Sequence, residues 1–84
     1  MTMDEWTGLN RFPHIDYIKI DVEGMEFDVL RGSIATINRY RPKIIIEIHD
    51  GEGYNIRRNV EHLLTLLRYG HEHVSGLNDY FFPL

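Results

Sequence analysis

The feature that most constrains the fold is a pair of apolar, β-branched runs separated by a helical pattern. Residues 15–22, IDYIKIDV, place apolar side chains on both sides of an expected strand. Residues 43–49, KIIIEIH, form a second run of the same kind. Strands that are apolar on both faces are typical of parallel sheets covered by helices on two sides. The chain is therefore expected to be an α/β protein whose first two strands are parallel neighbours.

The intervals around these runs carry helical signals. Thr2 followed three residues later by Glu5 resembles a capping box, which predicts a short helix over residues 4–10. Apolar residues at three- and four-residue spacing over residues 27–37 define one helix face. Gly32-Ser33 interrupts that face, so a break is expected there, with Ser33 as the candidate cap of the second piece.

The rest of the chain predicts one more helix and a hairpin. Apolar residues over 60–67 line a helix face, with Asn55 as the expected N-cap and Gly70 as the residue that ends the helix. Residues 71–77 and 79–84 resemble two short strands joined near residues 76–78. The expected order is β-α-β-α-β-β, a three-layer α/β sheet with a C-terminal antiparallel hairpin, in a single domain over residues 1–84.

Composition limits the class of partner. The net charge is −4 and the nine Lys and Arg residues form no block, which disfavours nucleic acid. The chain has no Cys, which excludes disulfides and thiolate metal sites. No apolar run approaches the ~20 residues of a membrane span, and the polar, acidic start does not resemble a secretory signal. A cytoplasmic protein without a membrane partner is expected.

Three acids lie around the carboxyl end of the first strand. Asp21 and Glu23 flank its carboxyl end, and Glu26 lies in the first turn of the helix after it. In open α/β sheets this edge is where ligands bind. One of these carboxylates could orient a substrate hydroxyl or accept its proton. The alternative is that Glu23 and Glu26 only complement the positive end of the helix, at ~0.3–1 kcal/mol each.

A second polar group, Glu47, His49, Asp50 and Glu52, follows the second strand. Because parallel strands end at one edge of a sheet, Glu47 is expected beside Asp21. His49 is a candidate general base, with an ordinary loop histidine as the alternative. Two carboxylates and a histidine would also suit Mg²⁺ or another hard cation, but such acids are more often solvated, and no metal ligand is assigned.

Other polar positions have two interpretations each. Lys19, inside the first strand, is either a charge partner for Asp21 or a substrate, or a side chain whose stem packs on the sheet while its amine reaches water. Glu47, Gly51 and Gly53 fit a loose E-x-x-x-G-x-G cofactor loop, although a surface loop is the better interpretation.

Aromatic and remaining histidine residues are expected in structural or surface positions. Core and edge packing is expected for Trp6, Tyr80, Phe81 and Phe82. Surface positions without a ligand are expected for His62, His71 and His73.

The segments IDYIKIDVEGMEFDVLRG and RYRPKIIIEIH share a pattern with one known family. That pattern is a strand I-K-x-D-V-E-G, then E-x-x-V-L-x-G, then R-P and an apolar strand ending in E-x-H. The residues that match it are Ile18, Lys19, Asp21, Val22, Glu23, Gly24, Glu26, Val29, Leu30, Gly32, Arg41, Pro42, Glu47 and His49. On these residues the chain resembles the FkbM-type family of S-adenosylmethionine-dependent methyltransferases, and the closing NDYFFPL extends the resemblance over nearly the whole chain.

Two further resemblances are weaker. IDYIKID also resembles a strand of cyclic-dinucleotide phosphodiesterase barrels, and the longer run resembles the phosphoacceptor segment of response-regulator receivers. The other parts of those domains do not appear in the sequence.

The resemblance implies methyl transfer from S-adenosylmethionine, most simply to a hydroxyl of a small-molecule acceptor. The implied catalytic residues are Asp21, Glu23 and His49, and the implied substrate-binding residues are Lys19, Glu26 and Glu47.

The match is to the C-terminal half of the class I methyltransferase fold, from the fourth of its seven strands onward in spatial order 4-5-7-6. The family's Gly-rich cofactor loop and ribose-binding acid lie on earlier strands, so no cofactor-binding residue is assigned. The cofactor is expected to be held with a second chain or a second copy. The alternative is a non-catalytic interaction module that pairs through its exposed first strand, as a homodimer or with a partner chain. A truncated gene product or an engineered fragment is the third expectation.

Overall fold

The computed structural model describes residues 2–10, 12–21, 24–49 and 55–84. The elements in that part of the chain are α1 (Met3–Asn10), β1 (Tyr17–Ile20), α2 (Glu26–Arg31), α3 (Ile34–Tyr40), β2 (Lys43–Glu47), α4 (Ile56–Leu66), β3 (Tyr69–Ser75) and β4 (Asn78–Pro83). A helix thus precedes β1, and the break between α2 and α3 lies at Gly32-Ser33 as predicted. None of the described helices is both long and apolar enough to cross a bilayer.

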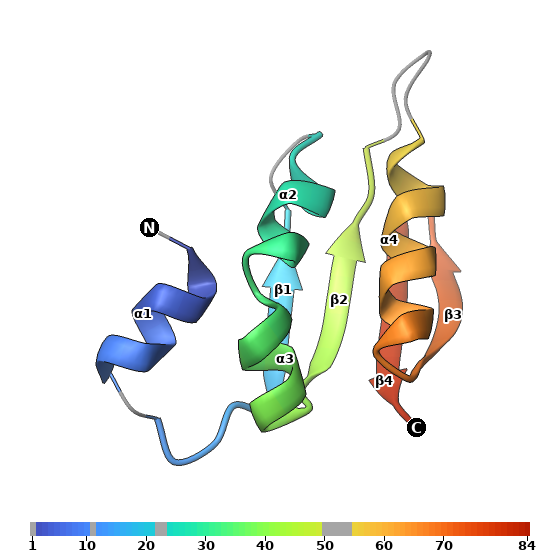
Figure 1. The fold of residues 1–84 in the computed structure, drawn as a ribbon. Helices are drawn as coiled ribbons and strands as arrows, with labels where there is room; N and C mark the ends of the chain where they lie inside the picture. Colours follow the sequence, from blue (N-terminus) through green and yellow to red (C-terminus); the bar gives the residue numbers. More distant parts are fainter. Residues whose placement is uncertain (1, 11, 22–23, 50–54) are drawn as a thin grey trace.

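The strands form one mixed sheet in the order β1-β2-β4-β3 (Figure 1). β1 and β2 are parallel, with Ile20 opposite Ile46. β4 is antiparallel to β2, and β3 and β4 form the antiparallel hairpin at the end of the chain. β1 and β2 therefore end at the same edge of the sheet, the upper edge in Figure 1.

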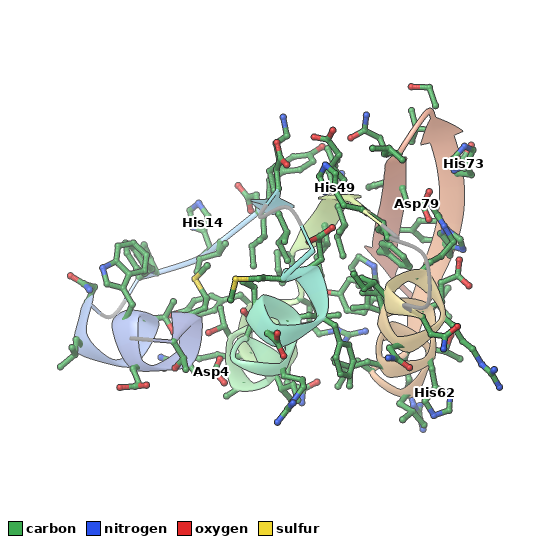
Figure 2. All side chains as sticks on the ribbon, turned by 90° about the horizontal axis from the view of Figure 1, so that it is seen from above. Asp4, His14, His49, His62, His73 and Asp79 are labelled. Carbon is green, nitrogen blue, oxygen red and sulfur yellow. The ribbon has the colours of Figure 1, made fainter. Side chains whose placement is uncertain are left out.

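The described helices lie on one face of the sheet (Figures 1 and 2). The buried apolar residues, which form one core cluster, are Ile18, Ile20, Leu30, Ile37, Ile44, Ile46, Ile48, Ile56, Val60, Leu64, Tyr69 and Phe81. Helix α2 also contacts α4 across this face. The described part of the chain therefore has two layers, and the expected three-layer arrangement is wrong for it.

The other face of β1 is exposed. Ile18 and Ile20 are buried, whereas Tyr17 and Lys19 are exposed. The prediction of a strand covered on both sides is wrong for residues 17–20, because α2, α3 and α4 pack against the opposite face. Lys19 is consequently not a buried charge and needs no buried partner. Val22, the last residue of the predicted strand, lies outside the described residues.

The capping box at the start of α1 is confirmed. The backbone N–H of Thr2 donates to Glu5 Oε1 at 3.2 Å, and the backbone N–H of Glu5 donates to Thr2 Oγ1 at 3.1 Å. These reciprocal bonds satisfy donors that the first turn of a helix leaves without partners.

The start of α3 is capped from another element. Asp4 of α1 accepts hydrogen bonds from the N–H groups of Ala35 at 3.1 Å and Thr36 at 2.8 Å. Ser33 makes no side-chain cap, because its hydroxyl donates to the carbonyl of Val29 at 2.7 Å. The prediction that Ser33 caps this helix is therefore wrong, and Asp4 fastens α1 to α3.

The end of α4 also differs from expectation. Arg68, with φ of 63°, adopts the left-handed conformation after the helix, and Gly70 lies in β3 instead. Gly70 is covered by Phe82 of the neighbouring strand, and a Cβ at this position would lie 2.2 Å from a ring carbon. Glycine is needed here for close packing of the hairpin. Asn55 precedes α4, but its side chain makes no cap hydrogen bond.

Candidate functional site

The shared edge of β1 and β2 brings three predicted residues together. Asp21 follows β1, Glu47 ends β2 and His49 lies two residues further on. Each acid directly follows one member of the parallel pair Ile20 and Ile46, and a carboxylate oxygen of Asp21 lies within 4.8 Å of one of Glu47, so their predicted juxtaposition is confirmed. Figure 2 looks onto this edge and shows His49 beside the end of β2. We refer to Asp21, Glu47 and His49 as the rim site.

In the rim site one imidazole nitrogen faces two carboxylates. His49 Nε2 lies 3.6 Å from Glu47 Oε1 and 3.9 Å from Asp21 Oδ1. Both separations are too long for hydrogen bonds. The side chains of His49, Glu47 and Asp21 are 27%, 30% and 46% exposed, so a ligand can reach all three from solvent.

Glu26 holds His49 from the protein interior. Its side chain is 0% exposed, and its Oε1 accepts the backbone N–H of His49 at 2.6 Å and lies 3.0 Å from His49 Nδ1. Its Oε2 accepts the backbone N–H of Gly24 at 2.6 Å. Gly24 has φ of 93°, a conformation that favours glycine. The chain after β1 and the chain after β2 are therefore joined through one buried carboxylate.

The protonation of this pair follows from its hydrogen bonds. Burial raises the pKa of Glu26, but the hydrogen bonds from His49 and Gly24 outweigh it and hold that pKa below 4.5. Glu26 is therefore ionised at neutral pH and can only accept, so Nδ1 of His49 carries the proton between them. The hydrogen bond to Glu26 raises the pKa of His49 above 6.5 against partial desolvation, and the charges of Glu26, Glu47 and Asp21 add to the increase.

The arrangement gives His49 a defined tautomer. With Nδ1 donating to Glu26, the neutral imidazole keeps its lone pair on Nε2, which faces Glu47 and Asp21. A nitrogen of this kind can take a proton from a hydroxyl group or bind a cation. Glu26, which was predicted to bind substrate, has no exposed surface, and its carboxylate bonds His49 instead.

Two other predicted site residues are not brought into the rim site. Lys19 is exposed in the middle of β1, and the contacts described for it do not include the rim site. Glu23 lies outside the described residues, as do Asp50, Glu52 and the two glycines of the loose E-x-x-x-G-x-G pattern.

A second polar cluster, on the hairpin, was not predicted from the sequence. Asp79 of β4 is 0% exposed and accepts hydrogen bonds from His71 Nε2 at 2.8 Å and His73 Nδ1 at 2.6 Å. Arg57 of α4 also pairs with it. Figure 2 shows His73 and Asp79 close together on the hairpin. His71 and His73 are exposed, as predicted, but their shared contact with the buried Asp79 was not predicted.

The charge of Asp79 is stabilised by these partners. Burial raises the pKa of its carboxyl group, but the hydrogen bonds from His73 and His71 and the charge of Arg57 hold the pKa below 3.8. The hairpin pairing, which places His73 opposite Asp79, is the feature from which this cluster could have been predicted. Two histidines at alternate positions of a strand share a face, and an acid opposite one of them can reach both.

Comparison with known proteins gives one match. The family model described as the Methyltransferase FkbM domain matches residues 1–74. The searches of curated proteins and of solved structures found no match. The matched range covers β1, β2 and all three residues of the rim site.

Proposed function

This chain belongs to the FkbM methyltransferase domain family, and on that premise we propose that its rim site serves S-adenosylmethionine-dependent methyl transfer to a hydroxyl group. The observation that carries the proposal is the hydrogen bond between the buried Glu26 and His49 Nδ1, at 3.0 Å. It leaves Nε2 as a proton acceptor at the edge of the sheet where ligands of α/β proteins bind.

The acidic character of the rim site fits the two groups that would meet there. S-adenosylmethionine would supply a methyl group bound to a positively charged sulfonium. The carboxylates of Asp21 and Glu47 would attract that positive charge. His49 takes the proton of the acceptor hydroxyl at Nε2, and the resulting imidazolium is stabilised by Glu26, Glu47 and Asp21, at 3.0, 3.6 and 3.9 Å. Asp21 and Glu47 can also accept hydrogen bonds from further hydroxyls, which favours a small polyhydroxylated acceptor.

In this proposal the rim site forms only part of the surroundings of the cofactor. β1 is an edge strand of the described sheet, and Asp21 of the rim site follows it. The adenosine part of the cofactor would lie beside that edge.

The proposal is tested by binding and by turnover. Calorimetric titration with S-adenosylhomocysteine, over a range of chain concentrations that allows self-association, should show saturable binding. Replacement His49→Asn should lower release of S-adenosylhomocysteine from the methyl donor about 10²–10⁴-fold, as expected for loss of a general base. The control His62→Asn changes an exposed histidine of α4 and should leave turnover unchanged. Equal turnover in all three proteins would contradict the role of His49.

A second function, pairing through β1, is favoured by a separate observation. β1 is the edge strand of the sheet, and beside it an apolar hollow of about 280 Å³ is lined by Met3, Trp6, Phe12, Ile15, Ile18 and Lys19. An edge strand with free backbone groups beside an apolar surface can receive a strand of another chain. We propose that a second copy or a partner chain pairs here.

Sedimentation at micromolar concentration tests this pairing. The chain should sediment as a dimer, and Trp6→Lys, which places a charge in the hollow beside β1, should convert it to a monomer. Leu66→Lys is a matched control, because Leu66 is an exposed apolar residue of α4, remote in sequence from that edge. A monomeric parent chain, or a dimer that survives Trp6→Lys, would count against pairing at β1.

A further inference from the structure

We propose that the rim site binds a divalent transition-metal cation through His49 Nε2 and the carboxylates of Asp21 and Glu47. The inference shares its three residues with the proposed function and rests on it in no other way, because cation binding requires neither methyl donor nor acceptor.

The spacing of the three donor groups suits a shared cation. One oxygen or nitrogen from each of Asp21, Glu47 and His49 lies within 4.8 Å of the others, and Nε2 is 3.6 and 3.9 Å from the two acids. Ligands at about 2.0–2.2 Å from a tetrahedral or octahedral metal stand roughly 3–3.5 Å apart. Small side-chain movements would therefore bring the three donors to bonding distance of one ion.

The charge around the rim site also favours a cation. Asp21 and Glu47 have His49 as their ion-pair partner, and the residues that the structure describes give neither acid a Lys or Arg partner. A third carboxylate, that of Glu26, lies directly behind the imidazole.

The hairpin provides an internal comparison. Glu61, His71 and Asp79 also bring donor atoms within 4.8 Å of one another, but the guanidinium of Arg57 already pairs with Asp79. Among the described residues, a cationic side chain therefore neutralises these types of donor on the hairpin, whereas none pairs with them at the rim site. This difference selects the rim site.

The hydrogen bond between His49 Nδ1 and Glu26 is of a kind that is common at metal-binding histidines. Metal-binding histidines usually donate their second ring N–H to a carboxylate, which fixes the tautomer and the ring orientation. Glu26 accepts the Nδ1–H of His49 in this way, at 3.0 Å. A set of one imidazole and two carboxylates suits Mn²⁺ or Zn²⁺ better than Mg²⁺ or Ca²⁺, which prefer oxygen ligands. A cation on Nε2 would occupy the lone pair that otherwise takes a proton, so the two compete.

Calorimetric titration of the folded chain with MnCl₂, ZnCl₂ and MgCl₂, without methyl donor, tests the inference. We expect one cation per chain for Mn²⁺ and Zn²⁺ and weaker binding of Mg²⁺. His49→Asn and Asp21→Asn should each weaken binding at least 10-fold, and Glu26→Gln about 10–100-fold as for loss of a supporting carboxylate. Asp21 is exposed, so its variant tests the site even if a variant at the buried Glu26 fails to fold.

His71→Asn is the matched control, because it removes a donor from the cluster that Arg57 neutralises, and it should leave the affinity unchanged. Paramagnetic broadening by Mn²⁺ should likewise affect resonances around His49 before those around His71. Absence of Mn²⁺ and Zn²⁺ binding, equal affinity after His49→Asn, or loss of binding only after His71→Asn would overturn the proposal. Cation binding without methyl transfer would support this inference while counting against the proposed function, and turnover without cation binding would do the reverse.

Discussion

A single carboxylate, that of Glu26, decides what His49 presents to solvent. Glu26 accepts both the backbone N–H and the Nδ1–H of His49, so the ring cannot turn without breaking a bond to a buried charge. A buried carboxylate that loses its donors carries a desolvation cost of about 1–3 kcal/mol or more. The buried Glu26, which a ligand in solvent cannot reach, therefore sets the orientation of Nε2 toward Asp21 and Glu47.

The first prediction is that Glu26→Gln lowers the pKa of His49. The neutral amide removes the charge that, through its hydrogen bond to Nδ1, contributes most to the raised pKa of this imidazole. NMR titration of the His49 ring protons measures the change, with Asp28→Asn as a control because Asp28 is exposed and pairs with Arg31. An unchanged His49 titration in Glu26→Gln would show that the pair does not exist in solution.

At the scale of helices and strands, contacts with neighbouring elements override what the local sequence suggests about caps and helix ends. α3 is capped by Asp4 of α1, and β3 accommodates Phe82 of β4 over Gly70. In both cases the sequence offered a local candidate, Ser33 for the cap and Gly70 for a helix end. Ser33 instead bonds the carbonyl of Val29 while Asp4 caps α3, and Gly70 leaves room for Phe82 within the hairpin.

The second prediction concerns the cap of α3. Asp4→Ala should lower the free energy of unfolding by about 1 kcal/mol, within a range of roughly 0.5–2 kcal/mol, because two backbone donors lose their acceptor. Ser33→Ala should lower the free energy of unfolding by less, because the Ser33 hydroxyl bonds only the carbonyl of Val29 in the preceding helical turn. Urea unfolding followed by circular dichroism compares the two variants. A larger loss for Ser33→Ala would reverse the assignment of the cap.

The third prediction concerns the hairpin. Gly70→Ala should destabilise the chain by about 1–3 kcal/mol, because the added methyl group overlaps the ring of Phe82 and forces it to move. Phe82→Ala removes the overlapping ring, so the double variant should be more stable than the sum of the single effects predicts. A double-mutant cycle from urea unfolding measures this coupling. Additive effects would mean that the ring does not lie over Gly70.

At the scale of the whole molecule, the buried charges connect stability to pH. The pKa values of Glu26 and Asp79 are lowered in the folded state, so their contributions are present above the ordinary values of 4.5 and 3.8 and are lost as pH falls through the folded values. The pKa of His49 is raised in the folded state. Its contribution is therefore complete below 6.5 and is lost as pH rises through the folded value.

The fourth prediction follows from these signs. For these groups, stability should be greatest between pH 4.5 and 6.5 and should decline on both sides. Urea midpoints measured from pH 3 to 9 test this, and His49→Asn should flatten the decline on the alkaline side. In Asp79→Asn the acidic decline should become shallower, because that carboxylate no longer titrates. A profile that rises steadily toward pH 9 would contradict the raised pKa of His49.

The sequence alone determined the elements, the parallel pair of strands and the family. Helix periodicity and caps are local features of the sequence. Two strands joined by a right-handed crossover are expected to be parallel, and this alone predicted that Asp21 and Glu47, at the two strand ends, lie side by side. The motif positions Glu26 and His49 were visible as residues, but their hydrogen bond joins segments 23 positions apart.

Tertiary structure decided the rest. It left Lys19 exposed by placing the described helices on one face of the sheet, buried Glu26 and Asp79, and moved the cap of α3 to Asp4, 32 positions from Thr36. Periodicity tells which side chains share a face, but only packing between distant segments decides which face is covered and which polar groups must find a partner there.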